Sequence, residues 1–390
     1  MEKDRIKLNK GWELHQVGTT ETDWLAIRKM PSQVADILLD HEILTEEVKL
    51  GWCQEAQWIS DYEWEYRCCF ERPKGKRSRL IFKGLDTLAT IYLNGKEIGS
   101  HDDFYLPDSI EISDLCQDQN TLLIRFHRVM EWLAHEELPT YLEDAVLKCK
   151  LLRKPLHDFP LKNGPDESSY QGAVPGFTPV GVYDDIILET WDDMEITDEN
   201  IQAKLIGDRG EISFAVEGVS EDNTEVQILV KMEGCIIKDI CVEAKVLDGG
   251  YRAEGCIYIE NPKLWNPIGF GRQELYTIEL LVRKSGEILT EDRIEKTVGF
   301  RRIEMPVPLA FIINGKKVRL WGGSMDPMQG YTHCYQKERA ERIFDMVENA
   351  NMNTLRIWGE GIPLPDEFYE EADRRGILIW QEFFMGHGAY

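Results

Sequence analysis

The end of the chain alternates between strand-like and helix-like segments, and this pattern restricts the fold more than any other. Residues 337–350 carry apolar side chains at helical spacing, and a second helix is predicted between Pro365 near its first turn and Gly376 at its C′ position. A hairpin over 311–321 leads into a first strand, and apolar runs at 353–358 and 377–383 have the character of two further, buried strands. Strands that alternate with helices along a chain pair in parallel. We therefore predict three strands of a parallel sheet.

The rest of the chain reads as short β-strands separated by turns. Asn94-Gly95 and Asn314-Gly315 each lie between two strand-like runs, and both central positions of such a hairpin turn need a positive φ. Apolar and polar residues alternate over 122–127, as in a half-buried antiparallel strand. Many short strands with regular turn signals predict antiparallel β-sandwiches.

Three segments follow from these patterns. We predict a jelly-roll sandwich over 1–193, an immunoglobulin-like sandwich over 194–304 and the strand-helix unit over 305–390. Residues 154–181 are rich in glycine, proline and polar side chains and are predicted to form a long loop. Whether that loop reaches an active site stays open.

Composition excludes several classes of partner. The 390 residues include 45 Lys and Arg against 70 Asp and Glu, a net charge of −25, which argues against nucleic acid or an anionic membrane as a partner. The N-terminus lacks the apolar run of a signal peptide, and no stretch is apolar enough to span a bilayer, so we expect a cytoplasmic protein. The nine cysteines are scattered without zinc-binding spacing, and we expect free, buried thiols and no metal or cofactor.

Several motifs follow one another along the chain. They are Gly-Leu-Asp-Thr with Tyr-Leu-Asn-Gly (84–95), Asn-Pro-Lys-Leu-Trp (261–265), Asn-Met-Asn-Thr-Leu-Arg-Ile-Trp-Gly (351–359) and Gly-Ile-Leu-Ile-Trp-Gln-Glu-Phe (376–383). In this order they resemble the family 2 glycoside hydrolases, most closely their β-mannosidase-like branch. The resemblance spans nearly the whole chain. The likeness implies that 305–390 are the first three strands of a (β/α)8 TIM barrel.

The same likeness implies a retaining exo-β-glycosidase that removes terminal β-linked sugars. Such an enzyme needs one carboxylic acid to protonate the leaving oxygen and one carboxylate about 5–5.5 Å away as nucleophile. In the family these glutamates follow the fourth and seventh barrel strands, so we expect both beyond Tyr390. We therefore expect the 390 residues alone to be inactive. Glu360 and Glu382 follow adjacent strands, but their positions do not match the catalytic pair.

The predicted substrate-binding residues cluster at the ends of the last strands. Arg356 is implied to orient the nucleophile, although an ion pair between strands is the alternative. Trp358 is predicted to form a sugar-stacking wall, and Trp380 is either part of that wall or core. Gln381 and Glu382 are predicted to bind sugar hydroxyls. Asp326 follows the first strand and completes the candidate set.

The identity of the sugar is less constrained. The family's Gly-Trp-Asp-Trp-Gly-Pro run has no counterpart after Arg153-Lys154-Pro155, where this chain lacks the tryptophans. Where the family has Asn-Trp-Ile-Pro, this chain has Ser324-Met-Asp-Pro327. A β-mannoside, a β-glucosaminide or another β-pyranoside therefore all stay open as substrates. A non-catalytic carbohydrate-binding or interaction protein is the competing function, and a homodimer is a further alternative.

Overall fold

The computed structural model describes residues 2–20, 22–50, 53–129, 131, 179–325, 328, 332–359 and 362–384. Most of the predicted loop at 154–181 lies outside these ranges, as do Asp326 and Glu360. None of the described helices is both long and apolar enough to cross a membrane.

The first module consists of antiparallel sheets. Their strand orders are β1-β13-β6-β10, β3-β2-β5-β11-β8-β9 and β4-β12-β7. The strands are β1 (Asp4–Lys7), β2 (Glu13–Gln16), β3 (Leu25–Ala26), β4 (Ser32–Gln33), β5 (Trp64–Glu71), β6 (Arg77–Phe82), β7 (Leu85–Asp86), β8 (Ala89–Leu93), β9 (Lys96–His101), β10 (Asp108–Glu111), β11 (Gln119–Phe126), β12 (Gly181–Val182) and β13 (Ile186–Trp191). Helix α1 (Val34–Asp40) and two 3-10 helices, η1 (Glu46–Leu50) and η2 (Cys53–Asp61), lie between β4 and β5.

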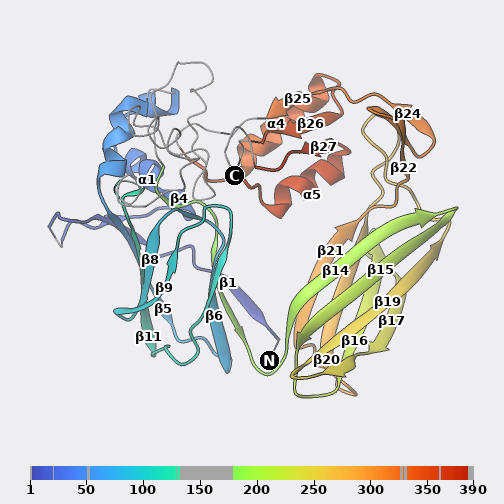
Figure 1. Ribbon diagram of the computed structural model, residues 1–390, viewed down its shortest axis with the longest axis horizontal. Coiled ribbons are helices and arrows are strands. Elements are labelled where there is room, and N and C mark those ends of the chain that lie inside the picture. Colours follow the sequence, from blue (N-terminus) through green and yellow to red (C-terminus); the bar gives the residue numbers. More distant parts are fainter. Residues whose placement is uncertain are drawn as a thin grey trace, which may run out of the picture.

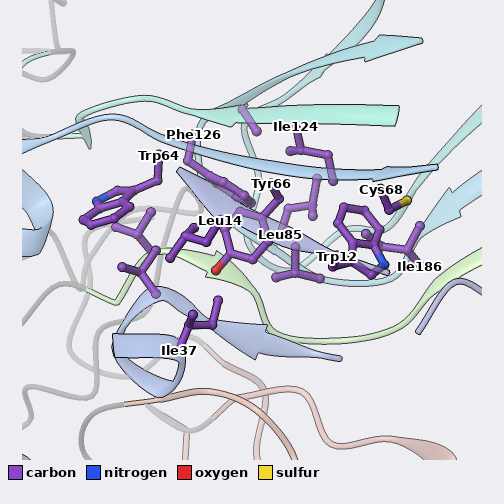
Figure 2. Packing of buried hydrophobic residues seen from close by; sticks show 14 of the residues in the cluster. Trp12, Leu14, Ile37, Trp64, Tyr66, Cys68, Leu85, Ile124, Phe126 and Ile186 are labelled. Atoms are coloured by element: carbon purple, nitrogen blue, oxygen red, sulfur yellow. The ribbon is translucent and has the colours of Figure 1, made fainter. Parts of the chain in front are cut away.

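One hydrophobic core lies between the two larger sheets of this module (Figure 2). Strand β11 supplies Leu122, Ile124 and Phe126, each fully buried, while the residues between them are partly exposed. The predicted alternation over 122–127 is thus confirmed. Trp12 and Trp64 belong to the same core, and burial of each Leu, Ile or Phe side chain in it contributes about 1.5–3 kcal/mol.

The second module consists of two four-stranded antiparallel sheets, ordered β14-β15-β19-β18 and β17-β16-β20-β21. A single core cluster takes residues from both sheets, as expected for a β-sandwich. The strands are β14 (Glu195–Ile206), β15 (Arg209–Val219), β16 (Thr224–Met232), β17 (Cys235–Glu243), β18 (Lys245–Leu247), β19 (Gly250–Glu260), β20 (Tyr276–Lys284) and β21 (Asp292–Val298).

The last segment begins with an antiparallel sheet of β22 (Ile303–Val307), β23 (Ala310–Ile313) and β24 (Lys316–Val318). The parallel unit follows. It comprises β25 (Gly322–Met325), α4 (Lys337–Asn349), β26 (Thr354–Ile357), α5 (Asp366–Arg375) and β27 (Leu378–Gln381). Strand β26 pairs in parallel with both β25 and β27, so the predicted three-stranded parallel sheet is confirmed.

The turn signals in the sequence are also borne out. Asn94 and Gly95 have φ values of 53° and 80°, and Asn314 and Gly315 have 50° and 77°, which suit the two hairpin turns. Gly376 ends α5 in the left-handed region at φ 78°.

The prediction that the cysteines are buried is wrong for most of those described. Cys68 and Cys334 are buried and Cys116 is half-buried, but the other four described thiols are exposed because they lie on the solvent side of β5, β17 and β19. These four are Cys69, Cys235, Cys241 and Cys256. All seven are free thiols, as expected.

Figure 1 shows the two β modules side by side, with the last segment reaching from the second module back toward the first. Two hydrogen bonds join the end of α5 to the second module. The indole nitrogen of Trp265 donates to the carbonyl of Asp373 over 2.7 Å, and the backbone nitrogen of Ile268 donates to Gly376 over 2.8 Å. Both acceptors lie at the end of α5. The return of the chain toward the first module places the carboxyl ends of the parallel strands close to that module.

Candidate functional site

The parallel sheet presents two chemically different faces. Met325, Leu355 and Ile357 belong to a core cluster with the apolar faces of α4 and α5. Successive side chains of a strand point to opposite faces, so Ser324, Arg356 and Trp380, which form one cross-strand row, lie on the face opposite to that core. The candidate site is therefore built on this opposite face, at the carboxyl ends of the strands.

Arg356 links all three strand ends. Its Nε donates to Oε1 of Glu382 over 2.7 Å, and its Nη1 donates to the hydroxyl of Ser324 over 2.8 Å. The second oxygen of Glu382 accepts the backbone N–H of Gly359 over 3.0 Å. The predicted alternative for Arg356, an ion pair between strands, is thus present in this structure.

The side chains of this ion pair keep moderate access to solvent, 37% for Arg356 and 31% for Glu382. A pair exposed to this degree contributes little net stability, of order 0–1 kcal/mol. What it does contribute is orientation, because two carboxylate contacts and one hydroxyl contact hold the guanidinium in one direction. Glu382 is thereby engaged by protein groups, and its predicted role in binding sugar hydroxyls stays a prediction.

The structure separates the remaining candidates. Trp358 follows β26 on the same side as Arg356 and is half-buried. Gln381 points to the helix-covered side, where its Oε1 accepts the hydroxyl of Tyr369 in α5 over 2.8 Å. The structure therefore does not bring Gln381 together with Arg356. Asp326 lies outside the described residues.

Trp380 is 44% exposed, so it is not a plain core residue. It lines a cavity of about 450 Å³ between β22–β24 and the parallel sheet. Thr354 and Leu378, the first residues of β26 and β27, line the same cavity, which places it toward the amino ends of the strands. The side chain of Trp380 thus lies against this cavity, although its backbone shares a row with Arg356.

Aromatic residues of the first module cover the loops that leave the parallel strands. Phe104 and Tyr183 form a buried cluster with Cys334, after β25, and Ile362, after β26. Tyr105 stacks on Phe384, after β27, with ring centroids 5.9 Å apart. The first module therefore contacts the loop after each of the three strands.

Sequence reasoning missed this contact and one histidine within it. His333 is 1% exposed, and its Nδ1 lies 3.0 Å from Oδ2 of Asp86. No local pattern signals a pairing between residues 247 positions apart. Among the described residues no group of three or more His, Cys, Asp or Glu side chains could hold a metal ion.

Comparison with known families matches two parts of the chain. Residues 12–163 match the model described as glycosyl hydrolase 2 galactose-binding domain-like, and 194–301 match glycosyl hydrolases family 2. Together they cover both β modules.

The chain is also similar to curated β-mannosidases. β-Mannosidase B of Thermothelomyces thermophilus is 27% identical over 414 residues, covering 99% of this chain and 46% of that protein. β-Mannosidase of Mus musculus is 27% identical over 407 residues, covering 93% of this chain and 43% of that protein. The chain thus spans less than half the length of these relatives.

Solved structures share the fold. A β-D-mannosidase from Dictyoglomus thermophilum superposes with a TM-score of 0.80 at 24% identity, covering 98% of this chain and 47% of that one. An exo-β-D-glucosaminidase superposes with a TM-score of 0.72 at 17% identity, covering 97% and 43%.

Proposed function

Because the chain belongs to glycoside hydrolase family 2 and matches the N-terminal part of β-mannosidases, we propose that it is the N-terminal portion of a retaining exo-β-glycosidase. Its substrates are terminal β-linked sugars of oligosaccharides. Its domains are a jelly roll (1–193), an immunoglobulin-like sandwich (194–304) and the start of a TIM barrel (305–390). A cytoplasmic location and a homodimer stay predictions.

The observation that carries this proposal is the parallel unit β25-α4-β26-α5-β27, with Arg356 at its carboxyl edge. A (β/α)8 barrel begins with such a repeat, its helices cover the outer face, and its active site lies at the carboxyl ends of the strands. The helices here cover one face, and Arg356 projects from the other.

In the proposed mechanism Arg356 supplies fixed positive charge beside the nucleophile. A cation within about 4–6 Å keeps a carboxylate ionised and hence nucleophilic. Glu382 and Ser324 hold the guanidinium, so the arginine needs little reorganisation when the reaction starts. Trp358 supplies the apolar wall against which a sugar ring stacks.

The proposal gives no catalytic pair to the 390 residues. Glu382, the carboxylate that β27 supplies, is already paired with Arg356 and hydrogen-bonded to Gly359. Glycoside cleavage requires a proton donor and a nucleophile at a set separation. The 390 residues alone should therefore release no aglycone from an aryl β-glycoside.

The competing function, a carbohydrate-binding module, draws support from the match of residues 12–163 to a galactose-binding domain-like model. It makes a different prediction for the same chain. Isothermal calorimetry with β-linked oligosaccharides should give a measurable enthalpy of binding to the 390 residues if they act as a binding module. The glycosidase proposal expects no such affinity, because a sugar site on three strands is incomplete.

The substrate is tested on the native gene product at its natural length. A panel of 4-nitrophenyl glycosides should show release from the β-mannoside or the β-glucosaminide and none from the α-anomers. Proton NMR of the first product should show the β-anomer, since retention requires a glycosyl-enzyme intermediate. An α-anomeric first product would exclude the retaining mechanism.

A further inference from the structure

A buried polar cluster joins the first module to the loop after β25. Gln33 is central to it: its Nε2 donates to Oδ2 of Asp86 over 2.7 Å, and its Oε1 accepts the backbone N–H of His333 over 2.6 Å. The imidazole Nδ1 of His333 lies 3.0 Å from the same carboxylate oxygen. Gln33, Asp86 and His333 are each at most 1% exposed.

A second set of contacts flanks the first. The hydroxyl of Thr332 donates to Oδ2 of Asp36 over 2.7 Å, and the same carboxylate oxygen accepts the backbone N–H of Gln33 over 3.0 Å. Burial raises the pKa of Asp36, while the hydrogen bonds from Thr332 and Gln33 act in the opposite direction. Cys334 places its thiol 3.6 Å from Asp36. The cluster thus engages three consecutive residues, 332–334.

These partners come from opposite ends of the chain. Gln33 ends β4, Asp86 ends β7 and Asp36 lies in α1, whereas residues 332–334 connect β25 to α4. The geometry is specific, because Oε1 of Gln33 accepts the backbone N–H of His333 and Oδ2 of Asp86 contacts its imidazole. Apolar contact alone would hold the two surfaces together but would allow them to slide.

We propose that the Gln33–Asp86–His333 cluster is a positioning site that fixes the loop after β25 in one register against the first module. Phe104 and Tyr183 pack against both His333 and Ile362. Through these two rings the cluster also restricts the position of Ile362 after β26. The first module thereby sets the shape of the carboxyl edge that carries Arg356. This inference concerns backbone positions and does not depend on the identity of the proposed reaction.

Hydrogen–deuterium exchange of the 390-residue chain tests the inference. In His333→Ala the backbone amides of 332–336 should exchange about tenfold faster or more, because the buried carboxylate of Asp86 loses its contact with the imidazole. The amides of 362–364 should accelerate to a smaller extent. His333→Asn keeps an N–H donor near the position of Nδ1 and should restore most of the protection.

A matched control lies inside the first module. His15 is 7% exposed, and its Nδ1 lies 3.4 Å from the buried carboxylate of Glu65, so His15→Ala also removes a buried histidine–carboxylate contact. It should leave exchange at 332–336 unchanged. If His333→Ala does not fold, the nearly isosteric Thr332→Val removes only the hydroxyl, which donates to Asp36 and accepts the backbone N–H of Cys334, and it should accelerate the same amides.

Three results would overturn the proposal. The first is unchanged exchange at 332–336 in His333→Ala or Thr332→Val. The second is an Asn variant no better protected than the Ala variant, since that would assign the effect to lost volume. The third is an equal acceleration in His15→Ala, which would mean general destabilisation.

Discussion

Lys3 lies in a buried cluster of charges between the first and second modules, and its replacement by methionine should destabilise both together. Its Nζ is 3.1 Å from Glu189 in β13 and 3.1 Å from Glu195 in β14, and its side chain is 1% exposed. Arg5 and Arg79 complete the cations, and Asp292 in β21 completes the carboxylates. The three positive and three negative charges balance.

The size of the effect follows from that balance. Lys3→Met leaves one buried carboxylate uncompensated, and removal of one partner of a buried pair costs about 3–5 kcal/mol. Arg5 and Arg79, with side chains 40% and 24% exposed, can relax toward the vacated position. We therefore expect the lower end, a loss of about 3 kcal/mol in the free energy of unfolding. Lys7→Met on the same strand removes an ion pair to Asp185 whose lysine is 61% exposed, and should cost less than about 1 kcal/mol.

Urea unfolding at pH 7, followed by tryptophan fluorescence, measures the free energy of unfolding of both variants. Trp191 is a local reporter, since Lys3 and Arg79 lie about 5 Å from its ring. Burial on its own raises the pKa of Glu189, but the charges of Lys3 and Arg79 outweigh it and hold that pKa below its ordinary 4.5.

The sign of the pH dependence follows from that lowered pKa. The stabilisation by ionised Glu189 is fully present above pH 4.5 and is lost as the pH falls through the lowered pKa. The difference in free energy of unfolding between wild type and Lys3→Met should therefore become smaller below pH 4.5. Equal losses of unfolding free energy in Lys3→Met and Lys7→Met would refute the reasoning. So would a difference between wild type and Lys3→Met that does not change with pH.

Two further changes test other parts of the structure. Cys68 and Cys69 are neighbours on opposite faces of β5, and burial raises the pKa of the Cys68 thiol. Iodoacetamide at pH 8 should therefore alkylate Cys69 and leave Cys68 unmodified until the protein unfolds. Peptide mass spectrometry reads both sites, and early labelling of Cys68 would contradict its burial. Gly376→Ala should lower the melting temperature by several degrees, because φ is 78° there and a Cβ would lie 2.7 Å from the backbone nitrogen of Ile268. Gly234 also has a positive φ but open space around it, so Gly234→Ala should cost only the backbone strain of about 1 kcal/mol. Equal shifts of the melting temperature in the two variants would exclude the packing contribution.

The elements of the fold were largely predictable because their signals are local. Periodic apolar residues determine α4, Asn-Gly pairs determine the turns after Leu93 and Ile313, and Gly376 determines the end of α5. Each of these depends on residues within one or two turns of chain. Such short-range preferences survive in the folded protein because no tertiary contact opposes them.

The site was only partly predictable because its contacts are not local. The sequence identifies Arg356 as a candidate, but its pairing with Glu382 and Ser324 depends on the register of three strands. A single position separates Gln381 from Glu382, and the alternation of side chains sends them to opposite faces. The burial of His333 depends on residues near the N-terminus, and nothing in its own neighbourhood indicates it.

We propose that Arg356 serves a glycoside-cleaving site that this chain begins to build. The most direct measurement is kcat/KM for 4-nitrophenyl β-D-mannopyranoside, or for the β-glycoside that the panel selects, with the native gene product and its Arg356→Lys variant. Lysine keeps the charge but loses the forked contacts to Glu382 and Ser324, so we expect a loss of about 100-fold or more. A native product that cleaves no β-glycoside, or a variant with unchanged kcat/KM, would contradict the account.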